Sequence, residues 1–166
     1  MYLQSFNEEG IDNIVDKYST MVYKLAFART RNKENADDIF QEVFLRYIRK
    51  KPKFENEAHE KAWFIRVTIN CSKTLFSFIT RENHEELTDN ISTKEETEEI
   101  MEEFLEKLSP DYRTVIHLFY YEGYSTLEIS KLLNKKESTV RMQLTRARRY
   151  LKDIMEGGNN NVWNFI

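Results

Sequence analysis

The sequence predicts an all-α protein with two small helical domains joined by an acidic linker, the C-terminal domain being a helix-turn-helix. Apolar residues recur at helical spacing, and the 166 residues include only two Pro and four Gly, which disfavours a sheet with many tight turns. Residues 1–81 hold 11 acidic and 14 basic side chains, and residues 108–166 hold six acidic and nine basic ones. Residues 82–107, between them, hold 11 acidic and only two basic side chains. The expected parts are domains 1–81 and 101–156, linker 82–100 and tail 157–166.

The first two expected helices are amphipathic. We expect the second to begin with Asn35 as its N-cap and to end before Pro52, which cannot continue a helix. The expected inward residues of the first helix are Ile11, Ile14, Val15, Tyr18, Val22 and Leu25. Those of the second are Ala36, Ile39, Phe40, Val43, Phe44, Tyr47 and Ile48, which leaves Asp38, Gln41, Glu42 and Arg46 facing outward.

A third helix is expected over residues 58–81. Its predicted core stripe consists of Ala62, Ile65, Ile69, Phe76 and Ile79. Another face carries Trp63, Arg66, Asn70 and Lys73 at helical spacing. An aromatic ring, a cation and an amide on one face suit unpaired bases, which stack on rings and bond to amides. For Trp63 alone, a core position is an equally good interpretation.

The acidic stretch that follows contains several residues that disfavour helix interiors, among them Asp89, Asn90, Ser92 and Thr93. We interpret residues 82–100 as a linker. Its acids either keep it solvated or suit it to a basic channel on a partner.

The helix-turn-helix is expected to begin at Thr126. Ser125 followed by Glu128 predicts a capping box at the start of a helix over residues 126–133. Asn134 suits the turn because Asn tolerates left-handed backbone conformations. We place the turn at residues 134–137 and the second helix after it, with Ser138 as its N-cap.

The second helix of this motif has a basic outer face. Its expected inward residues are Val140, Leu144, Ala147, Leu151 and Ile154. Its expected DNA-binding residues are Ser138, Thr139, Arg141, Met142, Gln143, Thr145, Arg146 and Arg149. Arg and Gln make paired hydrogen bonds to guanine and adenine, so this pattern favours DNA reading over a merely solvated helix face.

Other functions are disfavoured by what the sequence contains. Cys71 is the single cysteine, and His59, His84 and His117 fall in separate segments without a metal-binding pattern or a Gly-rich phosphate loop. We therefore expect no enzyme, no metal, no cofactor and no small-molecule substrate. The sequence also lacks a signal-like start and a run of apolar residues long enough for a membrane span, so we expect a cytoplasmic protein with no membrane association.

Three segments match a known family pattern in the family's order. They are DDIFQEVFLR at residues 37–46, AWFIRVTIN at residues 62–70 and LSPDYR at residues 108–113. The chain resembles a bacterial RNA polymerase sigma factor of the sigma-70 family, and its small size resembles the extracytoplasmic-function (ECF) group. The resemblance runs from about Phe6 to Met155. Asn134 stands where Gly is usual in the turn, and Glu137 and Ser138 replace the common Gly before the recognition helix.

The resemblance implies a division of labour and a set of partners. Residues 1–81 are similar to sigma region 2, which binds core RNA polymerase, recognises the −10 element and melts promoter DNA. Residues 101–156 are similar to region 4, which binds the double-stranded −35 element. The implied polymerase contacts are Asp38, Gln41, Glu42 and Arg46, and the implied contacts to the melted −10 element are Trp63, Arg66, Asn70 and Lys73. An anti-sigma protein is a further implied partner.

Two alternatives share part of this evidence. One is a free-standing helix-turn-helix regulator whose N-terminal part serves dimerisation or sensing. The other is a polymerase-binding adaptor without DNA contact. The surface of residues 1–81 distinguishes the regulator from a sigma factor, since a regulator needs a pocket or a symmetric interface there. Substitution of Arg141 and Arg146 with Ala distinguishes the adaptor, because an adaptor would keep its activity.

Overall fold

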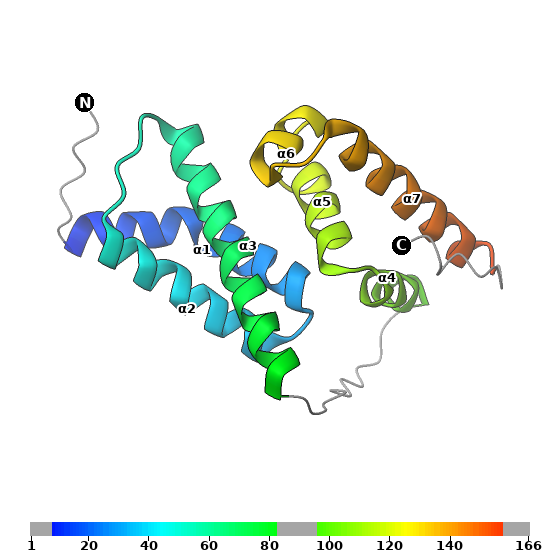
Figure 1. The fold of residues 1–166 in the computed structure, drawn as a ribbon. Coiled ribbons are helices and arrows are strands. Elements are labelled where there is room, and N and C mark those ends of the chain that lie inside the picture. Colours follow the sequence, from blue (N-terminus) through cyan, green and yellow to red (C-terminus); the bar gives the residue numbers. More distant parts are fainter. Residues whose placement is uncertain (1–7, 83–95, 158–166) are drawn as a thin grey trace. The chain divides into compact units, whose positions relative to one another are not determined.

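The computed structural model describes residues 8–82 and 96–157, which form seven α-helices and no strand. The chain divides into two compact units, residues 1–83 and 84–166. The first unit contains α1 (Glu8–Thr30), α2 (Lys33–Lys50) and α3 (Glu57–Glu82). The second contains α4 (Glu96–Lys107), α5 (Pro110–Tyr120), α6 (Thr126–Leu133) and α7 (Glu137–Met155) (Figure 1).

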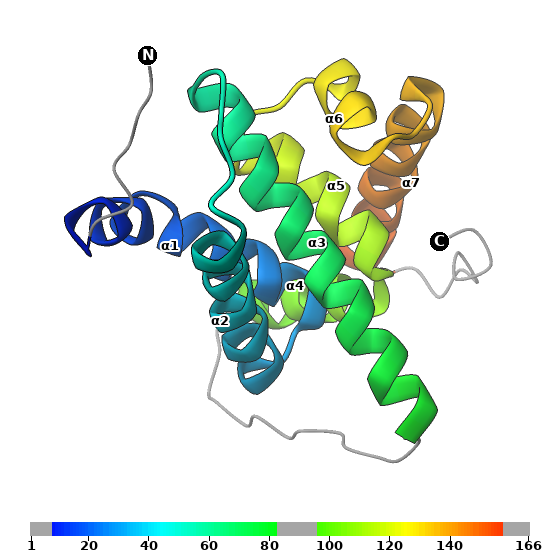
Figure 2. The same cartoon turned by 60° about the vertical axis from the view of Figure 1, so that its left-hand side comes forward.

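In the first unit, α1 packs against both α2 and α3, and α2 also packs against α3 (Figures 1 and 2). Each helix buries one stripe because apolar residues at spacings of three and four share a face. The predicted stripe of α1 is confirmed at Ile14, Tyr18, Val22 and Leu25, which are all buried. That of α2 is confirmed at Ala36, Ile39, Val43, Phe44 and Tyr47.

The start of α2 lies earlier than the sequence suggested. Asn32, not Asn35, is the N-cap, and its Oδ1 accepts a 2.9 Å hydrogen bond from the Asn35 backbone N–H. Asn35 therefore lies within the first turn, where backbone N–H groups need a capping acceptor. The helix ends at Lys50, and Lys51 adopts a left-handed conformation before Pro52.

Two expected core residues are exposed. Ile48 on α2 and Ile79 on α3 have exposed fractions of 39% and 46%. The last turns of α3 extend beyond the helices it packs against, so Ile79 has no layer to cover it (Figures 1 and 2). The stripe that α3 buries is instead centred on its middle: Glu60, Phe64, Ile65, Thr68, Ile69, Cys71 and Ser72. Ala62 and Phe76 are only partly buried.

The polar residues in this stripe are satisfied locally. The Thr68 hydroxyl donates to the Phe64 carbonyl at 2.7 Å, and the Ser72 hydroxyl donates to the Ile69 carbonyl at 2.8 Å. Arg29 of α1 donates from Nε to the Ser72 hydroxyl. Buried hydroxyls remain compatible with a core when backbone carbonyls accept their hydrogen bonds.

The second unit has α7 as its central helix, which packs against α4, α5 and α6. One core cluster joins α4 to α7 and consists of Phe104, Leu108, Tyr112, Ala147 and Tyr150. Burial, together with the nearby Glu103 carboxylate, raises the pKa of Tyr150 to about 12. A second group of buried residues holds α6 against α7: Ile129, Leu132, Val140 and Leu144.

Helix α4 begins at Glu96, so residues 96–100 are helical although the sequence suggested a linker there. Acidic side chains in a first turn interact favourably with the helix dipole. Phe104 is buried beside Tyr150, with ring centroids 5.6 Å apart, and this contact anchors the helix. The linker residues 83–95, including His84 and Asp89, and the tail residues 158–166 lie outside the described part of the chain.

Candidate nucleic-acid interface

The start of α6 has the capping box that the sequence predicted. The Glu128 backbone N–H donates to the Ser125 hydroxyl at 3.1 Å, and the Ser125 backbone N–H donates to Glu128 Oε2 at 2.8 Å. The hydrogen bond from the Ser125 backbone N–H to the Glu128 carboxylate, together with the Ser125 side chain, holds the pKa of Glu128 below its usual value. The reciprocal contacts satisfy two backbone donors that the helix itself leaves without acceptors.

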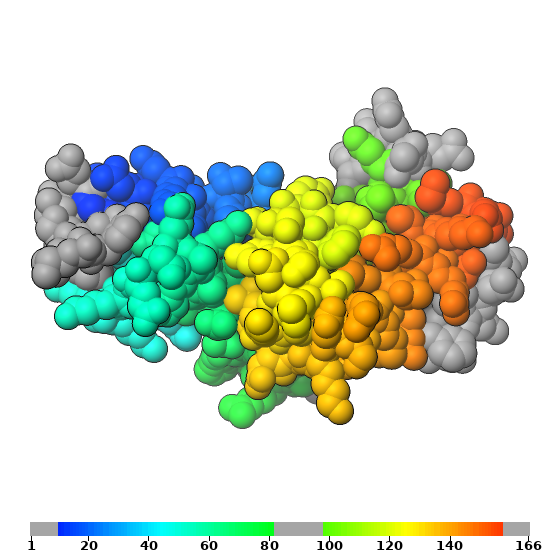
Figure 3. Space-filling view, turned by 90° about the horizontal axis from the view of Figure 1, so that it is seen from above, coloured from blue at the N-terminus to red at the C-terminus, as the bar shows by residue number. Residues whose placement is uncertain are grey.

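The turn between α6 and α7 spans residues 134–136. Asn134 has φ 52° and ψ 48°, so the predicted left-handed conformation is confirmed. The Lys135 backbone N–H donates to the Ser130 carbonyl at 2.9 Å, which closes the C-terminal end of α6. Figure 3 shows the surfaces of α6 and of the start of α7, in yellow and orange, side by side.

Helix α7 begins at Glu137, one residue before the Ser138 that the sequence suggested as the cap. Lys136 is the N-cap and its side chain makes no capping hydrogen bond. Glu137 instead accepts a 2.9 Å hydrogen bond from the Thr126 hydroxyl at the start of α6. An acidic residue in the first turn also suits the helix dipole. Ser138 is therefore an exposed residue of the first turn.

Most of the predicted DNA-reading side chains of α7 lie on its solvent face. Those that are exposed are Ser138, Arg141, Met142, Thr145 and Arg149, and those partly exposed are Thr139 and Arg146. The cations and hydroxyls among them have the donors and acceptors that base edges and phosphates require.

Gln143 was expected on the outer face of α7 but is buried: it is only 7% exposed, and its Oε1 is buried without a hydrogen-bond partner in the described part of the protein. It lies three residues after Val140 and four before Ala147, both of which are buried. These spacings place all three on one helix face. The side chain is part of the packed side of α7 and cannot reach a DNA groove in this conformation.

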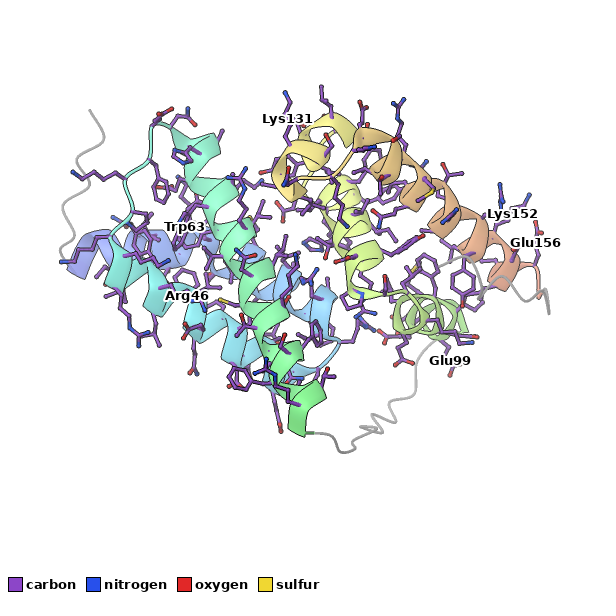
Figure 4. All side chains as sticks on the ribbon, in the orientation of Figure 1. Arg46, Trp63, Glu99, Lys131, Lys152 and Glu156 are labelled. Atoms are coloured by element: carbon purple, nitrogen blue, oxygen red, sulfur yellow. The ribbon has the colours of Figure 1, made fainter. Side chains whose placement is uncertain are left out.

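On α3, the predicted residues Arg66, Asn70 and Lys73 are exposed on one face. Trp63 is half-buried, with its ring centroid 6.0 Å from Tyr47, 6.0 Å from Phe54 and 5.0 Å from Phe64. Figure 4 shows Trp63 on the side of α3 that faces α2. The ring is packed against other aromatic rings and the residue is only partly exposed, and a contact from Trp63 to DNA stays a prediction.

On α2, Asp38 and Gln41 are exposed, and Glu42 forms an ion pair with Arg46, its Oε1 lying 2.8 Å from Arg46 Nε. The nearby Glu42 carboxylate raises the pKa of Arg46. Three of the predicted residues border a groove of about 320 Å³ between α2 and α3. Its lining consists of Asp38, Ile39, Glu42, Arg46, Cys71, Thr74, Leu75 and Phe78.

The charged side chains of this groove lie on α2, and most of its apolar side chains lie on α3. Phe78 is exposed on α3, and Cys71 is buried at the groove floor, where burial raises the pKa of its thiol. A helix with both apolar and charged side chains fits such a surface better than a small polar ligand does.

Within residues 8–82 and 96–157, no three His, Cys, Asp or Glu side chains are grouped so that they could hold a metal ion. His59 is exposed and accepts a hydrogen bond from the Glu55 backbone N–H, whereas His117 is buried with its Nε2 3.7 Å from Glu122. None of the described helices combines the length and the apolar character that crossing a membrane requires.

Two contacts within the second unit were not predicted from the sequence. One is the bond from Thr126 to Glu137, and the other joins Arg148 to Tyr120, whose hydroxyl lies 2.6 Å from Arg148 Nε. Both connect separate helices, so no local spacing indicates them. The ion pair between Glu137 and Arg141 on α7 does follow a local spacing of four residues, and that spacing could have indicated it.

The helical fold, the helix-turn-helix and its basic outer face together define a DNA-binding protein. Comparison with known families identifies the class: residues 14–81 match Sigma-70 region 2, and residues 98–151 match Sigma-70, region 4. Together these matches cover most of the chain, one in each unit. The protein belongs to the sigma-70 family, and its relatives place it in the ECF group.

The ECF RNA polymerase sigma factor SigX of Bacillus subtilis is 26% identical over 165 residues, which span 90% of this chain and 85% of that protein. SigM of the same organism is 27% identical over 168 residues, which span 91% and 98% of the two chains. The fold is also similar to that of the sigma factor RpoE of Bartonella quintana, solved in complex with the anti-sigma factor NepR. That similarity has a TM-score of 0.74 at 18% identity and covers 89% of this chain and 98% of the other.

Proposed function

We propose that this protein is an ECF-type sigma factor that binds core RNA polymerase in the cytoplasm and directs promoter-specific initiation of transcription. One observation carries the proposal: a region 2 match and a region 4 match occur in one chain, each on its own helical unit. A free-standing regulator with a sensing module would not need a region 2 surface. The relatives are named as RNA polymerase sigma factors, which supports the same function.

Residues 101–156, which lie within the second unit, bind the double-stranded −35 element in this proposal. Helix α7 lies in the major groove, where Arg141, Arg146 and Arg149 supply donors for guanine edges or phosphates. The smaller residues Ser138, Thr139, Met142 and Thr145 complete the reading face. Gln143 is removed from it because its side chain is packed inside the unit.

The first unit, residues 1–81, opens the −10 element. Asn70 offers both a donor and an acceptor to the edge of an unpaired base, and Arg66 and Lys73 neutralise nearby phosphates. The accessible part of Trp63 offers a stacking surface, and its packing against Tyr47 and Phe54 keeps that surface in one orientation.

The outer surface of α2 binds core RNA polymerase. Asp38, Gln41, Glu42 and Arg46 supply charges and hydrogen-bonding groups for this contact, and the groove between α2 and α3 accepts apolar side chains of the same partner helix. Opposite charges at the edge of an interface guide association and fix orientation.

The mechanism is recruitment, because the proposed steps are binding and strand capture without bond making. Each unit offers few phosphate contacts, so its own binding to DNA is weak and falls with rising salt. Attachment of both units to polymerase raises the effective concentration of the second contact once the first has formed. Promoter selection therefore requires the complex with polymerase.

Reconstitution tests the proposal directly. The purified chain is mixed with bacterial core RNA polymerase, and the mixture is analysed by gel filtration and by run-off transcription from a promoter library. We expect co-elution and transcripts that share −35 and −10 sequences. Failure to co-elute with core enzymes from several bacteria, in the absence of any inhibitory protein, would contradict the proposal.

An anti-sigma protein is a further partner under this proposal. Two proteins of similar fold were solved with such regulators or their domains, namely RpoE with NepR and CnrH with the cytosolic domain of CnrY. A regulator that occupies the groove between α2 and α3 would block polymerase. Competition between a co-purifying protein and core polymerase for this chain is the corresponding measurement.

A further inference from the structure

We infer that Glu137 is a positioning residue that orients Arg141 for base reading by α7, with the Thr126 hydroxyl holding Glu137 in place. This inference rests on the proposed function, since it assigns a role in −35 recognition.

The two oxygens of the Glu137 carboxylate have different partners. Oε1 accepts a 2.9 Å hydrogen bond from Thr126 Oγ1, and Oε2 lies 3.8 Å from Arg141 Nη2. Thr126 is the first residue of α6, and Glu137 is the first residue of α7. One carboxylate therefore connects the start of one helix, the start of the next and a cation on the reading face.

The exposure of the two charged side chains suits this arrangement. The Glu137 side chain is 34% exposed, whereas the Arg141 side chain is 65% exposed. The acceptor is thus fixed near the protein surface, and the guanidinium extends from it into solvent. An Arg side chain loses much rotational freedom when it binds a base, and a neighbour that restricts the free side chain reduces that loss.

The chemistry leaves Arg141 able to read a base. A guanidinium has five N–H donors, so a contact with Glu137 through one nitrogen leaves others for the O6 and N7 acceptors of guanine. The carboxylate also disfavours the approach of a phosphate to the same place, because both are anions. A base edge is therefore a better partner for Arg141 than the DNA backbone.

The test is a selection of −35 sequences with the reconstituted holoenzyme, because free sigma factor is not expected to select them. A promoter library with random bases at the −35 element is transcribed by the wild type and by Arg141→Ala, Glu137→Gln and Thr126→Val. Glu137→Gln keeps the size and the acceptor for Thr126 but removes the charge, whereas Thr126→Val keeps the charge and removes the hydroxyl.

We expect Arg141→Ala to lose base preference at one or two positions. Glu137→Gln reduces the preference at those same positions by about threefold to tenfold, which is at or below the lower end of the range for losing a whole bidentate contact. Thr126→Val reduces it at the same positions by a smaller factor. Binding to DNA without a −35 element stays equal or becomes tighter in Glu137→Gln, because a negative charge near the backbone is removed.

The matched control is Glu156→Gln. Glu156 and Lys152 form an ion pair of the same spacing and the same 3.8 Å distance at the other end of α7 (Figure 4). This variant keeps the wild-type preference at every position, because the pair lies away from the start of the reading helix.

The outcomes separate the explanations. The inference would be overturned if Glu137→Gln kept the wild-type base preference at the positions that Arg141→Ala affects. It would also be overturned if Glu137→Gln lost base preference equally at all positions. An equal loss is what general destabilisation of the motif produces. If the wild-type holoenzyme selects no −35 sequence, the proposed function fails, and this inference fails with it.

Discussion

The hydroxyl of Tyr18 donates a 2.7 Å hydrogen bond to Oε1 of Glu60, a buried carboxylate 42 residues further along the chain. Lys17 lies 3.0 Å from the same oxygen, which gives the carboxylate a counter-charge. Burial and the Glu60 carboxylate both raise the pKa of Tyr18, so the phenol stays protonated and can donate. The contact fixes the first turns of α3, which carry Trp63, against α1.

Tyr18→Phe should lower the free energy of unfolding by about 1.5–3 kcal/mol, because a buried carboxylate loses a hydrogen-bond donor. Urea unfolding at neutral pH measures the difference. Tyr23→Phe is a matched control on the same helix, where Tyr23 is half-buried and stacks with Phe27. If Tyr18→Phe lowers the free energy of unfolding no more than Tyr23→Phe does, this account of Glu60 is contradicted.

Ser125→Ala should destabilise the second unit by about 1 kcal/mol, which is typical for loss of an N-cap. Thermal unfolding followed by circular dichroism measures it. Ser138→Ala is the control, since Ser138 is an exposed first-turn residue and does not cap α7. Equal destabilisation by the two substitutions would show that the start of α7 is wrongly placed.

The effect of Ser125→Ala should depend on pH. The pKa of Glu128 is lower in the folded protein than its ordinary value of 4.5. The ionised carboxylate therefore stabilises the fold above pH 4.5, and this stabilisation is lost as the pH falls through the folded pKa. Ser125→Ala keeps the backbone N–H of residue 125, which is the main cause of the lowered pKa, and removes only the contribution of the Ser125 side chain. The difference between wild type and Ser125→Ala should therefore narrow modestly below pH 4.5. A difference that widens toward acid would contradict the assigned direction.

Gln143→Met should leave −35 preference unchanged and should keep stability within about 1 kcal/mol of the wild type, or raise it. The substitution conserves volume and removes a buried carbonyl oxygen that has no hydrogen-bond partner in the described structure. Promoter selection and urea unfolding provide the two measurements. A changed base preference, comparable with that of Arg141→Ala, would place Gln143 on the DNA after all.

Asn70→Ala should slow promoter opening by about tenfold, the effect of losing one base-specific side chain. Its free energy of unfolding should stay within about 0.5 kcal/mol of the wild type, because Asn70 is exposed. Fluorescence of 2-aminopurine placed in the −10 element reports opening. Ser77→Ala, another exposed residue of α3, serves as the control and should open promoters at the normal rate.

The paired substitution Glu42→Arg with Arg46→Glu should weaken binding to core RNA polymerase by at least about tenfold, because the charges exchange places on the contact surface. An exposed pair of this spacing contributes only about 0–1 kcal/mol, so stability should change little. Fluorescence anisotropy with labelled protein measures affinity for core enzyme. Normal affinity would remove α2 from the proposed polymerase surface.

Local sequence patterns predicted what depends on neighbouring residues. The capping box of Ser125 and Glu128, the left-handed Asn134 and the inward stripes of α1 and α2 all follow from spacings of a few residues. The same patterns, together with the three family motifs, placed the candidate residues Arg66, Asn70 and Arg141 on exposed faces. Whether these residues bind DNA remains a prediction.

Two of the errors concern a face whose burial is decided by packing against distant segments, and a third concerns a helix cap. Ile79 is apolar but lies where α3 has no neighbouring helix to cover it, and Gln143 is polar but lies on the side of α7 that faces the core. The true cap of α2 is Asn32 because that residue, and not Asn35, precedes the first helical turn.

The sequence by itself therefore determined five of the seven described helices, the main apolar stripes of α1 and α2, and the family, because periodicity, capping and motifs are encoded within short stretches. Only the tertiary structure decided which partners meet across the chain. Glu60 receives Tyr18 and Lys17 from α1, and Glu137 receives Thr126 from α6. These contacts depend on how helices pack in three dimensions, and no spacing along a single helix specifies that packing.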